Sequence, residues 1–391
     1  MFEIVDEKRD GAVIKVIGVG GCGGNAVRHM MEKGVVGVEF IVANTDAQAL
    51  DKNPAPKRIS LGAQLTQGLG AGAKPDVGRD AAMESKMALQ EAIQGADMLF
   101  ITAGMGGGTG TGAAPVIAQM AREMGILVVA VVTKPFRFEM QKRERAAQAG
   151  IDELQKHVDS LIVVPNEKLI QVLGRNVKLQ AAFAASNDVL HGAVAGISEV
   201  IHKPGDVNRD FADVRTIMSE LGMAMMGTAT AVGEGRGKAA AMAAVKSPLL
   251  EDVDLQGARG VLLCITSSPD ITLDELCEIT ETVQEFIAPD ATMLWGQSFD
   301  AAMGDEVRVT MIATGLGKRK MVAVQGGMGA APRLEIPTLR TGTDNYTVLS
   351  DAVPTLVGME VSYDEPTITR NPGRSSSRSL EIPTFLRKQA D

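Results

Sequence analysis

The chain has 391 residues, of which 45% are hydrophobic and 22% are charged, and its formal net charge at pH 7 is -9. Its length predicts more than one folded domain, and its acidic balance argues against a protein that binds nucleic acid. Apolar stretches such as 125–132 are far shorter than the roughly 20 residues of a transmembrane helix, and the charged N-terminus lacks an apolar signal core, so we predict a cytoplasmic protein without direct membrane insertion.

Residues 1–11 are predicted to form a flexible N-terminus. From residue 12 onward, short β-branched runs alternate with segments of helical period, such as 79–95 and 111–125. This alternation predicts a doubly wound α/β domain with a parallel sheet over residues 12–178. The candidate strands are VIKVIGVG, VEFIVANTD, KRISLG, DMLFITAG, ILVVAVVTKP and SLIVVPN.

An Ala-rich segment at 179–203 predicts a long central helix that ends before Pro204 and Gly205 and joins two domains. Residues 204–317 predict a smaller α+β domain. The segment 318–379 is rich in Pro, Gly, Ser, Thr and Arg and predicts a disordered linker. Residues 380–391 regain apolar side chains and predict a short peptide that docks on a partner; an echo of it, LEIPTLR at 334–340, is assigned no role.

The first glycine-rich loop, GVGGCGG, follows a strand and leads into a helix predicted to begin near Asn25. Gly18, Gly20 and Gly23 have the spacing of a dinucleotide fingerprint, and an acid, Asp46, follows at about the distance that a ribose contact requires. Peptide N–H groups and the positive end of a helix favour a phosphate at such a loop. Taken alone, this loop indicates an NAD(P)-binding Rossmann site.

A second loop, TAGMGGGTGTG, also lies between a strand and a helix, which a dinucleotide enzyme does not require. The amides of Gly106 to Gly110 and the hydroxyls of Thr109 and Thr111 can surround a terminal phosphate as an anion nest. The two loops together therefore predict a nucleoside triphosphate site.

Neither loop is a common P-loop, because no Gly-Lys-Ser/Thr follows at the required spacing. Phosphate charge would have to be balanced by amides, helix dipoles and a cation, for which Mg²⁺ is the natural choice. The three cysteines and four histidines have neither the spacing of a zinc site nor that of a disulfide framework. The sequence by itself does not identify the protein ligands of that cation.

The second loop resembles the signature of the tubulin superfamily, and TAGMGGGTGTGAAPVIA resembles the version found in the FtsZ family of bacterial cell-division GTPases. VANTDAQAL, TKPFRFE and NRDFADVRTIM match further motifs of that family in order and spacing, so the resemblance covers about 12–317. It implies a tubulin-like fold and a polymerising GTPase that uses GTP and Mg²⁺ and releases GDP.

The resemblance also implies a set of nucleotide contacts. Glu139 and Arg143, four apart on a predicted helix, would reach the ribose and phosphates, although a surface ion pair is the alternative. Phe183 and Asn187 would contact the guanine, although Phe183 by itself suggests a core residue. The remaining contacts are Gly20, Gly21, Cys22, Gly23, Gly24, Asn25, Asn44, Asp46, Gly107, Gly108, Thr109, Gly110 and Thr111.

Hydrolysis requires a polarised water in line with the γ-phosphate, and the first domain offers no obvious residue for this. Asn208, Asp210 and Asp213 cluster in the loop after the central helix, although Asp213 could instead cap a helix. In the family this loop completes the site of the next subunit. If the pocket lies on one face of a subunit and the completing acids on the opposite face, the contact between subunits does not close on itself. Repetition of that contact gives filaments.

Two other functions fit parts of the sequence. An NAD(P)-dependent oxidoreductase would need a hydride-transfer site that the sequence lacks, and a nonpolymerising regulator would bind GTP without concentration-dependent hydrolysis. The resemblance further implies that Ile382, Pro383, Phe385 and Leu386 of the C-terminal peptide bind membrane tethers and division regulators. Assembly would then occur at the division site beneath the inner membrane.

Overall fold

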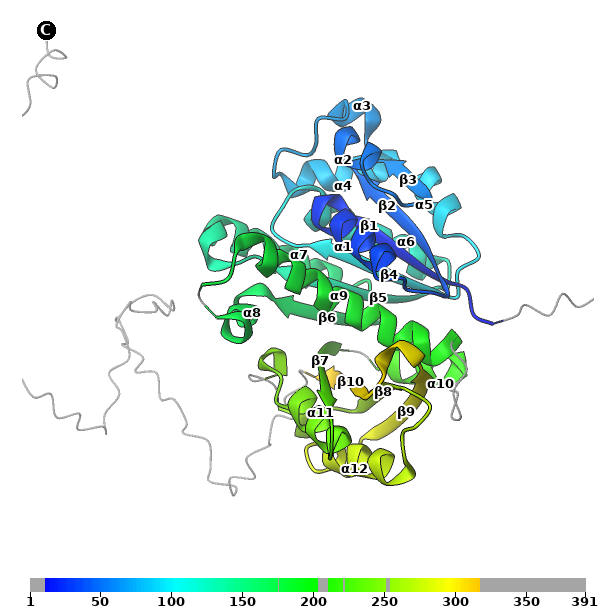
Figure 1. Cartoon of the computed structure of the whole chain (residues 1–391). Helices are drawn as coiled ribbons and strands as arrows, with labels where there is room; N and C mark the ends of the chain where they lie inside the picture. Colours follow the sequence, from blue (N-terminus) through cyan, green and yellow to red (C-terminus); the bar gives the residue numbers. More distant parts are fainter. Residues whose placement is uncertain (1–10, 175, 203–209, 221, 251–253, 317–391) are drawn as a thin grey trace, which may run out of the picture. The chain divides into compact units, whose positions relative to one another are not determined.

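The computed structural model describes residues 11–174, 176–202, 210–220, 222–250 and 254–316. Within these residues the strands form one ten-stranded sheet (Figure 1). In their order across the sheet the strands are β3 (Lys57–Ser60), β2 (Val38–Asn44), β1 (Ile14–Val19), β4 (Met98–Gly104), β5 (Leu127–Lys134), β6 (Ser160–Pro165), β7 (Gly222–Val232), β10 (Glu306–Leu316), β8 (Gly260–Ser267) and β9 (Thr292–Phe299).

The strands from β3 to β7 are parallel, whereas β10 is antiparallel to both β7 and β8. In the register, Val19 at the end of β1 lies opposite Ala43 of β2 and Ala103 of β4. The segments that follow these three strands therefore leave the sheet at the same edge. Ligands of open parallel sheets bind at that carboxyl edge.

Helices cover both faces of the sheet, which explains why its parallel strands are continuously apolar. One buried cluster packs α4, α5, α6 and α7 on β1–β6, and a second packs α1, α9 and α10 on the other face. The longer helices are α1 (Gly20–Glu32), α4 (Pro75–Glu84), α5 (Lys86–Ile93), α6 (Thr109–Glu123), α7 (Gln141–Leu154), α8 (Asn166–Leu173), α9 (Leu179–His202), α10 (Phe211–Met218), α11 (Arg236–Val245) and α12 (Leu273–Gln284), and the short ones are α2 (Ala47–Asp51) and α3 (Ala63–Thr66).

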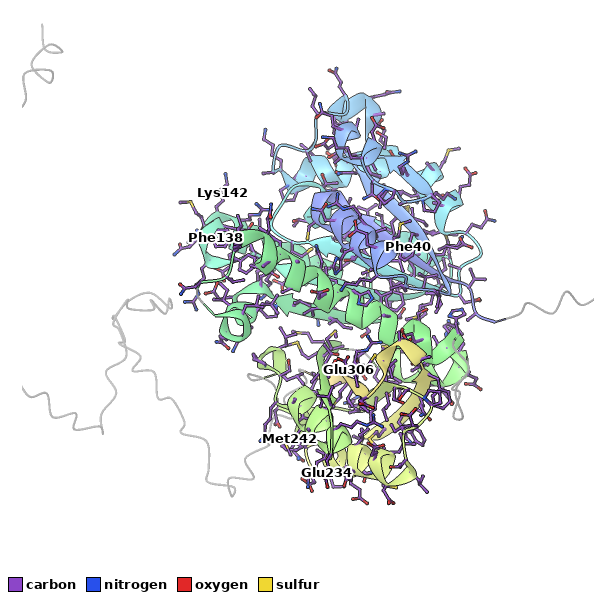
Figure 2. The ribbon with its side chains drawn as sticks, in the orientation of Figure 1. Phe40, Phe138, Lys142, Glu234, Met242 and Glu306 are labelled. Carbon is purple, nitrogen blue, oxygen red and sulfur yellow. The ribbon has the colours of Figure 1, made fainter. Side chains whose placement is uncertain are left out.

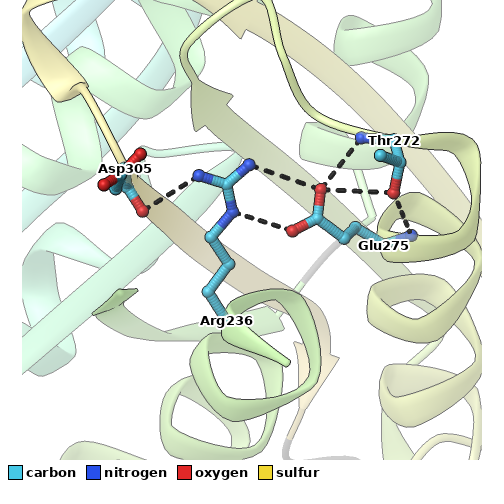
Figure 3. Close-up of polar contacts among 4 residues, drawn as sticks. All are labelled: Arg236, Thr272, Glu275 and Asp305. Carbon is cyan, nitrogen blue, oxygen red and sulfur yellow. Dashed lines mark hydrogen bonds and ion pairs between the residues drawn. The ribbon is translucent and has the colours of Figure 1, made fainter. Parts of the chain in front are cut away.

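The second domain has its own core, in which α11 and α12 pack on the strands β7 to β10. Arg236 at the start of α11 forms an ion pair with Glu275 of α12, with 2.7 Å between Nε and Oε1, and donates to the carbonyl of Asp305 at 3.0 Å (Figure 3). Glu275 also accepts from the backbone N–H of Thr272. One carboxylate thus links the two helices and caps one of them.

Most predicted elements are confirmed. All six candidate strands of the first domain form, and the central helix spans Leu179–His202. The segment of helical period at 79–95 is confirmed as helical but forms the end of α4 and all of α5, which are separated at Ser85. The Ser85 hydroxyl accepts from the N–H of Gly62 at 3.0 Å and donates to the carbonyl of Ser60, so this residue serves the end of β3 instead.

The predicted linker and C-terminal peptide lie outside the described residues, as do residues 1–10. Among the residues that the structure does describe, no helix combines the length and apolarity needed to cross a bilayer.

Candidate functional site

The two glycine-rich segments meet at the carboxyl edge of the sheet, after β1 and β4. Gly20 has a φ of +73°, and a Cβ added to it would lie 3.0 Å from the amide nitrogen of Gly110. A Cβ at Gly23 would lie 2.3 Å from the carbonyl oxygen of Thr102 on β4. Both positions therefore require glycine, one for its conformation and both for the close approach of backbone.

The first glycine segment forms the first turn of α1, and the second leads into α6, which begins at Thr109. Helix α1 begins at Gly20 and not near Asn25 as predicted, so Gly20, Gly21 and Cys22 present their N–H groups as a helix N-terminus. Neither α1 nor α6 has a side-chain cap or an acidic residue in its first turn. Two uncapped helix ends at one edge of the sheet suit an anion, because each carries a partial positive charge.

The two threonines of the second segment differ in what they contact. Thr109, at the start of α6, shares a hydrogen bond of 2.7 Å between its Oγ1 and that of Thr45. The Thr111 hydroxyl is buried and accepts from the N–H of Gly106 at 2.8 Å. Thr111 therefore holds the shape of the glycine turn, whereas Thr109 links that turn to the end of β2.

A cavity of about 330 Å³ opens beside the first glycine segment and extends toward α2. It brings together six of the predicted contact residues, but Glu139, Arg143, Phe183, Asn187 and the second glycine segment are not part of its wall. The predicted residues in the wall are Gly20, Gly21, Gly24, Asn25, Asn44 and Asp46.

Asn53 also lines this cavity and was missed by the sequence reasoning. It donates from Nδ2 to the carbonyl of Gly24 at 2.8 Å and accepts from the N–H of Ala55 at 3.0 Å. Asp46, by contrast, caps α2 by accepting from the N–H of Ala49 at 3.1 Å. No local pattern marks Asn53, because its partner lies 29 residues away.

Glu139 and Arg143 do form an ion pair, with 3.1 Å between Oε2 and Nη1, but they do not share a helix as predicted. Glu139 ends a 3₁₀ turn, Arg143 lies in α7, and Met140 between them has a φ of +74°. A Cβ at Gly107 would lie 4.0 Å from Nη2 of Arg143. The guanidinium is therefore beside the second glycine segment, where it can balance phosphate charge.

Cys22 of the first segment packs its side chain against the ends of β4 and β5: a Cβ at Gly104 would approach its sulfur to 2.8 Å, and the sulfur lies 3.8 Å from Thr133 Oγ1. Burial raises the pKa of the Cys22 thiol above its usual value, and the Thr133 hydrogen bond offsets this only in part. The thiol is thus protonated and weakly nucleophilic at neutral pH.

We therefore expect iodoacetamide to modify Cys22 slowly at pH 7 and progressively faster as the pH rises, because a raised pKa delays formation of the thiolate. Peptide mass spectrometry after timed alkylation would measure this, with the exposed Cys277 as the internal reference. Modified protein should no longer bind GTP. Equal labelling of both thiols at pH 7 would contradict the prediction.

Three phenylalanines cluster where α9 begins. Phe183 is 40% exposed and packs edge-on against Phe136, with ring centroids 5.4 Å apart, and Phe136 stacks on Phe138. Figure 2 shows Phe138 and Lys142 at the same end of the first domain. Asn187, one turn further along α9, is half-buried. An exposed ring next to the segment after β5 can accept a planar base by stacking.

The candidate catalytic acids lie at the opposite side of the sheet from the glycine segments, near the amino ends of the parallel strands. Asp210 caps α10 by accepting from the N–H of Asp213 at 2.8 Å, so the alternative in which Asp213 is the cap is wrong. Asp213 lies in the first turn of α10, and Arg215 of that helix donates to the carbonyl of Gly125, which precedes β5. Asn208 lies outside the described residues.

A parallel sheet with two uncapped helix ends at its carboxyl edge defines a nucleotide-binding α/β protein. Residues 13–174 match the Tubulin/FtsZ family, GTPase domain, and residues 222–317 match the FtsZ family, C-terminal domain. The chain is 51% identical over 408 residues to the cell division protein FtsZ of Pseudomonas aeruginosa, with all of both chains covered. It is also 51% identical over 391 residues, again with full coverage, to that of Buchnera aphidicola subsp. Schizaphis graminum.

Among solved structures, an empty FtsZ dimer of M. jannaschii is 43% identical, with a TM-score of 0.76 over 80% of this chain and 90% of that one. The chain therefore belongs to the Tubulin/FtsZ family. This membership favours GTP over the dinucleotide that the first glycine segment alone suggests, and it gives no support to a nonpolymerising regulator.

Proposed function

We propose that this protein is a GTPase that assembles head to tail in the cytoskeleton of bacterial cell division, with GTP hydrolysed at the junction between two subunits. Membership of the Tubulin/FtsZ family supports the GTPase activity. The relatives are cell division proteins by name, and one solved relative is a dimer.

The proposal of a shared site is supported by the positions of its two halves, which lie at opposite ends of the parallel strands. The glycine segments follow β1 and β4 at the carboxyl edge, whereas α10 contacts Gly125 before β5, at the amino edge. One subunit cannot bring Asp213 to its own phosphates. In a head-to-tail contact, the acids of one subunit would meet the nucleotide of the next, and the contact would repeat as a filament.

Exposed apolar side chains near the nucleotide edge support an association surface. Leu69 is 85% exposed, Met140 75%, Phe138 59% and Leu179 57%. Leu69 pairs with Asp46. Phe138 and Met140 lie just before α7, and Leu179 is the first residue of α9. A neighbouring subunit that covers them would gain hydrophobic stabilisation and would exclude water from the nucleotide.

In the proposed reaction, the amides of the two helix ends and Arg143 hold the phosphates. The carboxylates of the neighbouring subunit's Asp210 and Asp213 orient and polarise the attacking water. Mg²⁺ suits a triphosphate and would neutralise part of its charge. The described residues contain no group of three or more His, Cys, Asp and Glu side chains that could hold a metal.

The proposal is tested by the dependence of GTP turnover on protein concentration. Phosphate release per subunit should rise steeply as the concentration passes the threshold at which light scattering reports polymer, because only junctions contain a complete site. A specific rate that stays constant through dilution below that threshold would exclude the shared site. Nicotinamide binding without GTP binding would instead support the oxidoreductase.

We also propose that residues 380–391 bind membrane tethers and regulators and that the protein acts at the division site beneath the inner membrane. Deletion of 380–391 is expected to leave GTP turnover unchanged and to abolish the binding of a purified tether. Sedimentation of filaments with tether-coated vesicles would measure this. A variant that replaces Phe385 and Leu386 by Ala keeps the length of the tail and should lose tether binding in the same way. Loss of GTPase activity on deletion would contradict the assignment.

A further inference from the structure

His202 is the last residue of α9, and the next residue that the structure describes is Asp210, the cap of α10. With 24 residues at 1.5 Å each, α9 spans roughly 36 Å, from the phenylalanine cluster at the nucleotide edge to the opposite edge. The end of α9 therefore directly precedes, in the chain, the segment that leads to the candidate catalytic acids.

The ring of His202 is fixed by two carbonyl groups. Its Nε2 lies 2.9 Å from the carbonyl oxygen of Ala12, which precedes β1, and its Nδ1 lies 3.3 Å from the carbonyl oxygen of Ser198 one turn back. Since an imidazole nitrogen must carry a proton to bond a carbonyl, the 2.9 Å contact assigns the donor role to Nε2. This bond ties the helix end to the amino edge of the sheet.

The backbone around the ring is shaped to receive it. Gly37 has a φ of +76°, and a Cβ at this position would lie 2.7 Å from Cγ of His202. The buried Ser198 hydroxyl donates to the carbonyl of Val36 at 2.9 Å. The turn before β2 therefore contacts the last turn of α9 at two points, Val36 with Ser198 and Gly37 with His202. At Gly37 only glycine leaves room for the imidazole ring.

The acid-bearing helix is anchored on its far side as well. Val214 and Ile217 of α10 are buried in the core shared with α9, and Arg215 donates to the carbonyl of Gly125. The end of α9 and the acid-bearing helix α10 are thus each anchored at the amino edge, and Val200 of α9 belongs to the same buried cluster as Val214 and Ile217. A shift of the helix end at His202 would therefore disturb the core on which α10 packs.

We propose that His202 is a positioning residue for GTP hydrolysis: by bonding Ala12 it fixes where Asp210 and Asp213 are presented to the nucleotide of the adjoining subunit. This inference rests on the proposed shared site and adds to it a residue that touches neither nucleotide nor water. Because a misplacement of a catalytic group by about 1 Å can cost ~100-fold in rate, loss of this anchor should lower turnover without weakening nucleotide binding.

The test compares three variants in the full-length protein. His202→Phe keeps a ring against Gly37 but lacks both donors, His202→Ala lacks ring and donors, and His202→Gln keeps an amide N–H that can reach Ala12. We expect the Phe and Ala variants to lose kcat by about ten-fold or more, with the Gln variant near the parent. The affinity for GTP, measured at dilutions where no polymer forms, should be the same in all four proteins.

A mixing assay separates this role from a merely structural one. Gly107→Glu places a carboxylate beside the phosphates where a Cβ meets no atom closer than 4.0 Å, so it spoils the pocket and leaves the acids intact. His202→Phe mixed with Gly107→Glu should turn over GTP faster than either alone, whereas His202→Phe mixed with Asp213→Ala should not recover.

Three results would overturn the inference. They are parent-like turnover by His202→Phe, a loss of GTP affinity in His202→Phe as large as its loss of turnover, and recovery of turnover when His202→Phe is mixed with Asp213→Ala. A parent protein whose specific rate does not depend on concentration would instead overturn the proposed function, and the inference with it. The two failures are therefore distinct, because the first appears in variants of an active parent and the second in the parent itself.

Discussion

Asp213→Ala is expected to bind GTP normally and to hydrolyse it at least ~100-fold more slowly than the parent, which is the usual loss on removal of a group that acts on the attacking water. Asp213 lies in the first turn of α10 at the amino edge, far from the glycine segments, so the pocket should be unaffected. Polymers formed with GTP should persist, because loss of the γ-phosphate is what weakens the junction.

Asp213 is a cleaner position than Asp210 for this test. Asp210 accepts the N–H that caps α10, so its removal would cost about 1 kcal/mol of local stability in addition to any catalytic effect. The matched control is Asp274→Ala, which also removes an acid from the first turn of a helix, in α12 of the second domain. Phosphate release at a fixed concentration above the assembly threshold provides the measurement.

A mixture of Asp213→Ala with Gly107→Glu tests whether the two halves of the site come from different subunits. Each variant lacks one half, and only a junction between the two variants combines an intact pocket with intact acids. We expect the mixture to regain a measurable part of the parent rate. Parent-like turnover by Asp213→Ala alone, or a mixture no faster than its components, would rule out the shared site.

The sequence predicted what depends on local pattern. The apolar runs located the six strands of the first domain, and the Ala-rich periodicity located α9 from Leu179 to His202. The two glycine segments were correctly assigned to strand ends because glycine runs between strand and helix patterns are rare unless backbone must approach something closely. Their meeting at one edge follows from the parallel order of β1 and β4.

The features that the sequence did not predict depend on long-range contacts. Helix α1 begins at Gly20, where glycine's low helix propensity suggested a loop. No strand is predicted at β7, because only Thr228, Thr230 and Val232 of its 11 residues are β-branched; its partners β6 and β10 supply the pairing. The break at Met140 between Glu139 and Arg143 likewise has no local signal.

The second large effect is expected in the stability of the second domain, where Arg236 and Glu275 are largely buried, with side-chain exposures of 10% and 19%. Arg236→Met would leave the Glu275 carboxylate without its partner and is expected to lower the free energy of unfolding by about 3 kcal/mol, since removal of one member of a buried pair strands the other charge. Glu275→Gln should also destabilise, because the guanidinium then lacks a counter-charge, while the amide oxygen can still accept from Thr272.

The double variant Arg236→Met with Glu275→Gln is expected to recover much of the loss, because it removes both charges together. Urea unfolding followed by circular dichroism would measure all four proteins. If the two single losses simply add in the double variant, the two side chains do not act as a pair.

Acid provides an independent check on the same pair. The hydrogen bond from Arg236 is the main reason that the pKa of Glu275 lies below its usual value of 4.5. A carboxyl whose pKa is lowered by folding stabilises the folded state fully above its unfolded pKa, and the contribution disappears as the pH falls through the lowered folded value. The stability difference between the parent and Glu275→Gln should therefore be constant at neutral pH and shrink below about pH 4.5. A difference that stays the same at pH 3 and pH 7 would mean that the charge of Glu275 is not what stabilises the contact between α11 and α12.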